Sequence, residues 1–367
     1  GQVVALHETA VDAETTSPAD KARGRSEWDA ERAVTHTFEC IAQTVKKAGD
    51  VPIAAVGMAG QMHGMLLLSP DGRPASPFIG WQDQRCQDAV PGHDFNYIGW
   101  MMQLGGLGGF ARTGCPPATG YMGSTLFWMA ANKDERIVKS AGCCSGIRAC
   151  FMADYAVIRL TGEAAMTDTT NAAGSGLFDV AAGRWNRPLI ERLGLCHDVF
   201  PPVMKSGSIA GEVTPEAAAL TGLKAGTPVC VGCGDNQASF VGSVANAGEM
   251  ALVNIGTGAQ VSAWVPFMIT VPSVDTRPHL DGGFLLVGAP LCGGYSYQLL
   301  RDFFRQVGRA FFSGADQDPY EEMNRLARAV PAGADGLKCE PLFTGTRLDP
   351  AQRASWTGIS PVNFTPG

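Results

Sequence analysis

The stretch TPVCVGCGDNQASFVGSV, residues 227–244, decides the fold prediction for this chain. Its first part, residues 228–233, is a run of small and β-branched residues typical of a short buried strand, and Gly234 ends that run. Asp235 and Asn236 follow at the strand end, ahead of small and apolar residues that can begin a helix. Such strand-to-helix turns carry the chemistry of α/β proteins. A carboxylate there suits a general base, and the alternative is that Asp235 only caps the helix.

Composition and charge limit the functional classes open to the chain. With 367 residues, of which 45% are hydrophobic, it is long enough for about two domains with sizeable cores. The formal net charge of -7 and the lack of a basic cluster disfavour nucleic acid as a partner. No apolar stretch reaches membrane-spanning length, and the first residues lack the pattern of a signal peptide, so we expect a cytoplasmic protein without a membrane partner.

The cysteines do not indicate a disulfide scaffold, although the chain has 11 of them. They are a small share of a long chain and mostly occupy apolar segments, as buried reduced thiols do. Cys230 and Cys233 form a CxxC pair inside the predicted strand, where the two side chains do not easily converge. The cysteines therefore predict neither a metal site nor a redox site.

The N-terminal part alternates helix and strand patterns. Residues 26–49 have the acidic start, apolar stripe and glycine end of an amphipathic helix, and residues 53–58 follow as an apolar strand. A turn with Gln61, Met62 and His63 then leads into a second apolar strand. A polar turn between two strands is a favourable ligand position, and the alternative for His63 is a satisfied, partly buried imidazole.

The sequence WQDQR forms a second polar turn. Trp81 provides an aromatic plate, while Gln82, Asp83 and Arg85 provide donors and acceptors. A sugar site needs such a set, because hydroxyls take paired polar partners and the apolar face of a sugar stacks on a ring. The competing interpretation is a surface loop with an incidental ion pair. Further on, the glycine-rich stretch 91–115 is poor in charge and predicts a loop or lid.

Two β-rich runs, residues 250–254 and 260–265, predict a hairpin whose turn holds Gly256, Thr257 and Gly258. The backbone N–H groups and the hydroxyl of such a turn suit a phosphate oxygen. An ordinary hairpin turn is the alternative.

The stretch GGYSYQLLRDFFRQV, residues 293–307, predicts a helix that begins after two glycines and buries Leu299, Phe303 and Val307. Gly294 would let a flat ligand approach the backbone closely.

Several stretches taken together resemble the FGGY family of carbohydrate kinases, in the same order and with matching spacing. They are GQMHG (60–64), WQDQR (81–85), DYAVIRLTGE (154–163), TDTTNAAGSGLFD (167–179), AGEVTPEAAALTGLKAGTPV (210–229), CGDNQAS (233–239), NIGTGAQVS (254–262) and PLFTGTRLDP (341–350). The combination covers essentially the whole chain and is far more specific than any single stretch. Within the family, WQDQRC, TGYMGSTLFW, GDNQAS and NIGTGAQVS are most similar to sedoheptulokinases, while GQMHG and GDN are equally typical of xylulokinases.

The resemblance implies an α/β, ribonuclease-H-like (actin-like ATPase) fold with two domains around a cleft. It places a sugar-binding N-terminal domain at residues 1–242 and a nucleotide-binding C-terminal domain at residues 243–367. It also implies that the family's first phosphate-loop hairpin and its adenine-binding segment are missing, so that the chain would be truncated at both ends.

Carried over onto this sequence, the resemblance implies a catalytic base, a sugar pocket and a nucleotide site. The base is Asp235, the sugar pocket comprises Gln61, Met62, His63, Trp81, Asp83, Asn236 and Gln237, and the nucleotide site comprises Gly256, Thr257, Gly258, Gly294 and Gln298. ATP and Mg²⁺ are the implied cofactors, and the residues that hold the metal are not assigned.

The activity that the resemblance implies is phosphoryl transfer from Mg-ATP to the terminal hydroxyl of a ketose. Sedoheptulose is the first expectation and xylulose the alternative, because motifs do not report the depth of a pocket. The missing phosphate loops leave a further alternative, a catalytically silent sugar-binding paralogue. The expected partners are the ketose and ATP, and the sequence does not indicate an oligomeric state.

Overall fold

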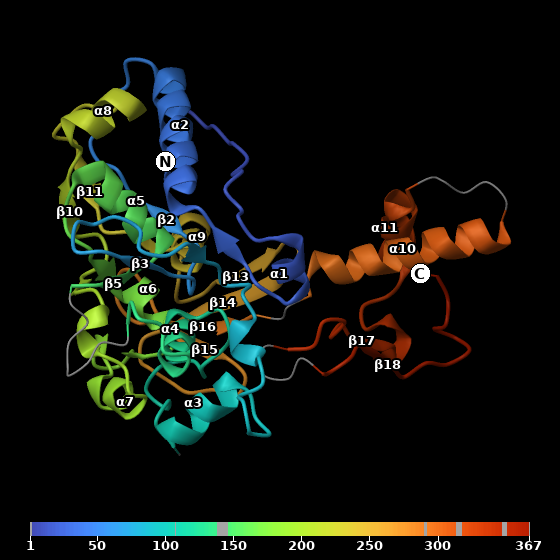
Figure 1. Cartoon of the computed structure of the whole chain (residues 1–367). Helices are drawn as coiled ribbons and strands as arrows, with labels where there is room; N and C mark the ends of the chain where they lie inside the picture. The colour runs from blue at the N-terminus through green and yellow to red at the C-terminus, as the bar shows by residue number, and fades with distance from the viewer. Residues whose placement is uncertain are drawn as a thin grey trace. The chain divides into compact units, whose positions relative to one another are not determined.

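The computed structural model describes residues 2–106, 108–137, 146–289, 292–312, 318–346 and 351–366. The chain forms two compact units (Figure 1). Unit 1 comprises Gly1–Met250 and Trp264–Leu286, and unit 2 comprises Ala251–Ala263 and Val287–Gly367. The domain boundary after residue 242 stays a prediction. Among the described residues, no helix has the length and apolar character needed to cross a membrane.

The elements of unit 1 are short and numerous. Its helices are α1 (Pro18–Ala22), α2 (Ala30–Ala48), α3 (Tyr97–Gly105), α4 (Met122–Ala131), α5 (Met152–Thr161), α6 (Thr169–Ala173), α7 (Arg187–Arg192), α8 (Pro215–Thr221) and α9 (Asp235–Ser243). Its strands are β1 (Glu27–Trp28), β2 (Ala59–Gly60), β3 (Leu66–Leu68), β4 (Phe78–Ile79), β5 (Arg148–Cys150), β6 (Thr167–Asp168), β7 (Phe178–Asp179), β8 (Arg184–Trp185), β9 (Val203–Met204), β10 (Ile209–Glu212), β11 (Pro228–Cys230), β12 (Cys233–Gly234) and β15 (Asp275–Pro278).

Unit 2 contains fewer elements. They are β13 (Ala251–Ile255), α10 (Gly294–Phe311), α11 (Tyr320–Ala329), β17 (Lys338–Glu340) and β18 (Ser355–Thr357). The chain passes from one unit to the other within β14 (Ala259–Val265) and β16 (Phe284–Gly288).

The core of unit 1 is organised around β3, which pairs antiparallel with β5. Leu67 lies in one apolar core together with Phe151, whereas Leu66 and Leu68 lie in a second core together with Tyr155. Successive side chains of a strand point to opposite faces, so this strand is buried on both sides. All three leucines are at most 2% exposed. The predicted strand after the Gln61–His63 turn is therefore confirmed, and it separates two cores.

The helix that precedes this core also follows the sequence pattern. Asp29 caps α2 by accepting a hydrogen bond from the backbone N–H of Arg32, as the acidic start predicts. The helix buries Val34 and Phe38 in the core of Leu66. In Figure 1, α2 runs beside α5 and α8, with which it makes its main contacts.

The strand predicted at residues 228–233 is divided in the structure. β11 ends at Cys230, and β12 begins at Cys233. Between them, the N–H of Val231 bonds to the carbonyl of Ser208, the residue before β10, with which β11 pairs antiparallel. β12 then pairs in parallel with β2, with Cys233 opposite Ala59. The strand end before Asp235 is thus formed by a separate short strand.

The loop or lid predicted at residues 91–115 contains a helix, so that prediction is wrong for its middle part. Asn96 caps α3 by accepting from the backbone N–H of Gly99, and the helix buries Tyr97 and Met101. The glycine run GGLGGF, which suggested a loop, begins only at the C-terminal end of the helix, at Gly105. A polar cap followed by buried apolar residues outweighed the low charge of the stretch.

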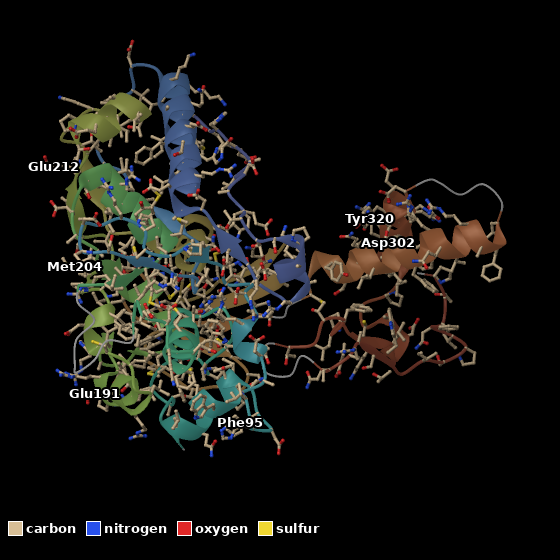
Figure 2. The ribbon with its side chains drawn as sticks, viewed as in Figure 1. Phe95, Glu191, Met204, Glu212, Asp302 and Tyr320 are labelled. Carbon is tan, nitrogen blue, oxygen red and sulfur yellow. The ribbon has the colours of Figure 1, made fainter. Side chains whose placement is uncertain are left out.

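The helix predicted at residues 293–307 is present as α10, but its stripe is not buried. Phe303 is 57% exposed, and none of the residues of α10 is buried. Between α10 and α11, Tyr297 stacks on Tyr320, and Arg301 lies 5.0 Å from the Tyr320 ring. Arg301 also pairs with Asp302 of its own helix, and Figure 2 labels Tyr320 and Asp302. The periodicity predicted an amphipathic helix correctly, but it could not show whether that face is covered.

The two-faced burial of β3 predicts the cost of shortening its leucines. Leu66→Ala and Leu67→Ala should each lower the free energy of unfolding by about 2–5 kcal/mol, because each change opens a cavity in a different core. Urea titration of both variants measures this.

Leu220→Ala is the matched control, since Leu220 on α8 is 63% exposed. Its free energy of unfolding should stay within about 0.5 kcal/mol of the wild type. If Leu66→Ala or Leu67→Ala changed the free energy of unfolding as little as Leu220→Ala does, burial on both faces of the strand would be contradicted.

Candidate functional site

The predicted sugar-side residues begin at the ends of two neighbouring parallel strands. In the β2 and β12 pair, Gly60 lies opposite Gly234, and the bridge between Val56 and Val229 is also parallel. Gln61 therefore leaves one strand at the level at which Asp235 leaves the other. Open α/β sheets bind ligands outside the carboxyl ends of their strands. The structure thus brings together the two turns that sequence analysis singled out separately.

Asp235 is the first residue of α9 and is open to solvent. Its Oδ1 accepts a hydrogen bond of 2.8 Å from the backbone N–H of Asn236. Desolvation by the surrounding protein raises the pKa of Asp235, while the Asn236 N–H and the positive charge of Arg277 act in the opposite direction. A solvent-accessible carboxylate with a raised pKa at a helix start is suited to proton transfer.

His63 is buried and held in a fixed orientation. Its Nδ1 lies 2.7 Å from the carbonyl oxygen of Gly174, which can only accept, so Nδ1 carries a proton and donates it. The imidazole stacks on the ring of Tyr121, with centroids 4.1 Å apart and planes 3° from parallel. The φ angle of His63 is 78°, in the left-handed region that a non-glycine residue rarely adopts. Such backbone strain is concentrated at functional sites.

A buried arginine lies beside this pair of turns. Arg277, in β15, is 3% exposed, and its Nη2 pairs with Asp275 at 2.9 Å. Its Nη1 lies 3.7 Å from the sulfur of Met62. The positive charge of Arg277 partly offsets the rise in the pKa of Asp235 that desolvation causes. A guanidinium cannot lose its charge in a protein, so this part of unit 1 holds a permanent donor group.

Sequence reasoning missed Arg277 and Tyr121. Tyr121 lies in the TGYMGSTLFW stretch that supports the family resemblance, and that stretch was its available signal. Arg277 lies in a strand with no motif, and a single arginine two residues after an aspartate gives no reason to expect burial. Only the structure relates it to Met62 and Asp235.

The two amides after Asp235 are buried. The Nε2 of Gln237 donates to the carbonyl of Pro278 at 3.2 Å, and its Oε1 has no hydrogen-bond partner among the described residues. Asn236 is also buried, next to the carboxylate that its N–H contacts. An acceptor left open inside a polar cluster is suited to a ligand hydroxyl.

Asp83 and Trp81 have different environments, although they are neighbours in sequence. Trp81 is 39% exposed, as a stacking plate for a sugar should be. Asp83 is buried, and each of its oxygens accepts two hydrogen bonds: Oδ1 from the N–H and Nε of Arg85, and Oδ2 from the Nη2 of Arg85 and the N–H of Ser26. These donors match the lone-pair sites of a carboxylate. Asp83 therefore stabilises the turn that contains Trp81.

The predicted phosphate turn lies in unit 2. Gly256 and Thr257 are exposed between β13 and β14, which pair antiparallel as predicted. The N–H of Gly293 bonds to the carbonyl of Thr257, and the N–H of Gly294 to that of Gly256, so the start of α10 is held against the turn. A Cβ at residue 293 would lie 2.2 Å from the carbonyl oxygen of Gly258. The two glycines are therefore needed for this close approach.

Other parts of the predicted nucleotide site are less defined. Gln298 lies on α10 and is exposed, four residues after Gly294 and therefore on the same helix face. Residues 347–350, at the end of the PLFTGTRLDP stretch, lie outside the described residues. Among the residues that the structure describes, no cluster of three or more His, Cys, Asp or Glu side chains could hold a metal ion.

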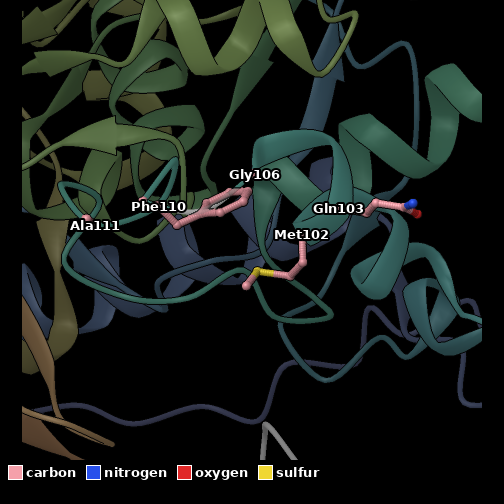
Figure 3. A pocket seen from close by; sticks show the side chains of 6 residues that line it. Met102, Gln103, Gly106, Phe110 and Ala111 are labelled. Carbon is pink, nitrogen blue, oxygen red and sulfur yellow. The ribbon is translucent and has the colours of Figure 1, made fainter.

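A cavity of about 510 Å³ lies elsewhere in unit 1, at the end of α3 (Figure 3). It is lined by Met102, Gln103, Gly106, Gly108, Phe110 and Ala111. None of the predicted site residues lines it, and its walls are mostly apolar. It does not have the polar groups that a sugar requires.

Comparison with known proteins identifies the family to which this sequence is similar. A sequence model described as the FGGY family of carbohydrate kinases, N-terminal domain, matches residues 1–242. The autoinducer-2 kinase of Yersinia enterocolitica serotype O:8 / biotype 1B is 28% identical over 351 residues, which cover 94% of this chain and 62% of that protein. The autoinducer-2 kinase of Yersinia pestis bv. Antiqua (strain Angola) is 28% identical over 350 residues, with coverage of 94% and 62%. The chain thus spans about 62% of the length of these curated relatives.

Solved structures are similar over nearly the whole of this chain. The xylulose kinase of Rhodospirillum rubrum matches with a TM-score of 0.79 and 25% identity, covering 96% of this chain and 67% of that one. The gluconate kinase of Lactobacillus acidophilus matches with a TM-score of 0.78 and 22% identity, covering 97% and 67%. These similarities show a shared α/β fold, over about two thirds of the length of those kinases.

Arg277 provides a test of the electrostatics around Asp235. Arg277→Met removes the positive charge that lowers the pKa of Asp235, so this pKa should rise and the carboxylate should ionise only at higher pH. A ¹³C NMR titration of protein labelled at the aspartate carboxyl carbons measures the change, with Asp235→Asn used to assign the signal.

Arg277→Lys is the control, because it keeps the charge and should leave the pKa of Asp235 closer to its wild-type value than Arg277→Met does. An Asp235 pKa that is unchanged or lower in Arg277→Met would contradict the assignment.

Proposed function

This chain belongs to the FGGY family of carbohydrate kinases, and we propose that it phosphorylates the terminal hydroxyl of a ketose with ATP. The observation that carries the proposal is the pair of parallel strand ends that sets Asp235 beside the Gln61–His63 turn. A carboxylate, an oriented imidazole and exposed or stacked aromatic rings form the polar and apolar set that a sugar requires.

The ketose we propose first is sedoheptulose, with product sedoheptulose 7-phosphate. Its support is the similarity of the WQDQRC, TGYMGSTLFW, GDNQAS and NIGTGAQVS stretches to sedoheptulokinases. Xylulose is the alternative, supported by the GQMHG and GDN stretches and by the xylulose kinase fold of Rhodospirillum rubrum. Autoinducer-2 is a further candidate, because curated relatives at 28% identity are autoinducer-2 kinases.

In the proposed mechanism, Asp235 acts as the general base. Its carboxylate accepts the proton of the terminal hydroxyl as that oxygen bonds to the γ-phosphorus, and the bond from phosphorus to the ADP oxygen breaks. The Asn236 N–H and Arg277 favour the ionised carboxylate that this step needs. Most of the rate enhancement in phosphoryl transfer comes from positioning and electrostatics, so an accurately placed hydroxyl matters more than a strong base.

The remaining sugar-side residues bind and orient the substrate. His63, fixed by the Gly174 carbonyl and the Tyr121 ring, exchanges a hydrogen bond with a sugar hydroxyl, and Trp81 covers an apolar face of the sugar. The open Oε1 of Gln237 accepts from another hydroxyl. Asp83 supports the turn that presents Trp81, since protein donors already occupy its oxygens.

ATP is the phosphoryl donor in this proposal, held through its phosphates at the turn formed by Gly256, Thr257 and Gly258. The exposure of Gly256 and Thr257 supports this assignment, because an exposed turn lets a phosphate oxygen approach the backbone and the hydroxyl of Thr257. Mg²⁺, when bound, neutralises phosphate charge in such reactions. The described residues contain no cluster of three or more His, Cys, Asp or Glu side chains for it, so no protein ligand is assigned to it.

The proposal is tested by ADP release from the purified chain with Mg-ATP and one acceptor at a time. The acceptors are sedoheptulose, D-xylulose, D-ribulose, glycerol and autoinducer-2. We expect turnover that is highest with sedoheptulose. If turnover were highest with xylulose or autoinducer-2, that compound would replace sedoheptulose as the proposed substrate, and the proposed kinase reaction would stand. If no acceptor gave ADP release but calorimetry showed sugar binding, the result would favour a sugar-binding paralogue instead.

Asp235→Asn tests the role of the base. The turnover number should fall by about a hundredfold or more, because an amide cannot accept the hydroxyl proton. The dissociation constant for the sugar, measured by calorimetry, should change less than about fivefold, since the amide keeps the shape of the side chain. Near-normal turnover in Asp235→Asn would remove Asp235 from the base role.

A further inference from the structure

The short helix α6 and the residue that precedes it form a buried polar element with no part in the proposed chemistry. Asp168 caps α6 and accepts from the backbone N–H of Asn171 at 2.9 Å. Asp168, Thr170 and Asn171 have no exposed surface. Buried polar groups of this kind cost stability unless they are bonded, so their bonds identify what the helix holds in place.

The first turn of α6 holds the strand end that leads to Asp235. The N–H of Gly234 donates to the hydroxyl oxygen of Thr170 at 2.8 Å, and this hydroxyl donates in turn to the Asp168 carboxylate, 2.8 Å from each oxygen. The Nδ2 of Asn171 donates to the carbonyl of Gly232 at 3.2 Å. Residues 232 and 234 are therefore both tied to α6 by side chains, immediately before the carboxylate.

The C-terminal end of the same helix holds the other half of the sugar-side site. Gly174, the C-cap of α6, accepts the Nδ1 proton of His63 at 2.7 Å. A Cβ at residue 174 would lie 3.2 Å from the terminal carbon of Met62. One helix of five residues thus contacts the residues that follow β2 and the residue that precedes Asp235. The separation of these two groups is set by a rigid buried element instead of by mobile loops.

We propose that Thr170 and Asp168 are positioning residues, which hold Gly234 and thereby fix the Asp235 carboxylate relative to His63. The inference rests on the proposed function, in which Asp235 is the base. Gly234 is the N-cap of α9, so rotation of its peptide changes the direction in which the side chain of the next residue leaves the backbone. Misplacement of a reacting group by about 1 Å can cost about a hundredfold in rate.

The test compares Thr170→Val with Thr170→Ser and with a control. Valine keeps the shape of threonine and removes both the acceptor for Gly234 and the donor to Asp168. We expect Thr170→Val to lower kcat about 10- to 100-fold, and to leave the sugar KM within about threefold of the wild type. Thr170→Ser keeps the hydroxyl, so it should restore kcat to within about threefold.

Thr221→Val is the matched control. Thr221 on α8 is fully buried in unit 1, and its hydroxyl donates to the carbonyl of Ala217 within its own helix. The change removes the same atom from the same residue type without touching the site. Its kcat should stay within about threefold of the wild type. Equal losses in Thr170→Val and Thr221→Val would mean that Thr170 acts through general stability, which would overturn the proposal.

A second readout does not require turnover. In the ¹³C titration of the aspartate carboxyl groups, Thr170→Val should move the Asp235 midpoint away from the wild-type value, because the carboxylate shifts relative to Arg277 and the Asn236 N–H. Thr221→Val should not move it. If the wild type shows no turnover but this shift occurs, the positioning role stands and the kinase proposal fails. An unchanged Asp235 midpoint in a folded Thr170→Val would overturn the positioning role.

Ser206→Ala examines the same group of bonds if Thr170→Val does not fold. The half-buried Ser206 donates to Asp168 at 2.5 Å. Its loss should lower kcat and move the Asp235 midpoint away from the wild-type value, each by a smaller amount than in Thr170→Val. No change in either quantity would then reject the proposal.

Discussion

The parallel pairing of β2 with β12 is the constraint on which the candidate site depends. Each strand is only two residues long, so the pairing contributes few hydrogen bonds. Its effect is geometric: two chain segments that are far apart in sequence end at the same level and in the same direction. The polar residues after both strands then face one region of unit 1. Side chains from α6 and β15 complete that region because their elements pack against these strand ends.

The two aspartates Asp83 and Asp235 show how the environment separates a structural role from a chemical one. Asp83 is buried, and four protein donors occupy its oxygens, so it has no capacity left for a ligand. Asp235 is open to solvent, and its side chain accepts a hydrogen bond from the N–H of its neighbour Asn236. Solvent contact leaves its oxygens able to exchange protons, while the surrounding protein still raises its pKa. The same residue type therefore anchors one turn and is available for catalysis in the other.

Much of this site could be predicted from sequence because its residues lie in turns with local signals. A strand pattern that stops at glycine located Asp235, and a polar turn between apolar strands located His63. Arg277 could not be found in this way, since its burial depends on contacts with a residue more than two hundred positions away. For the same reason, the sequence predicted α10 as an amphipathic helix but placed Phe303 inside, because periodicity does not show whether another element covers a face. The helix cap Asn96 was the local signal for α3. The glycine run at the end of the helix led to the prediction of a loop instead.

The burial of β3 on both faces has a consequence for how unit 1 opens. Two cores that share one strand cannot lose their packing independently, because exposing Leu67 in one core also releases Leu66 and Leu68 in the other. Local opening near β3 then carries nearly the full cost of global unfolding, and the two cores behave as one cooperative block. A protease that requires an opened backbone would therefore find no stable half of this block to release. Amide hydrogens in β3 and β5 would exchange with solvent together, at the slowest rates in the unit.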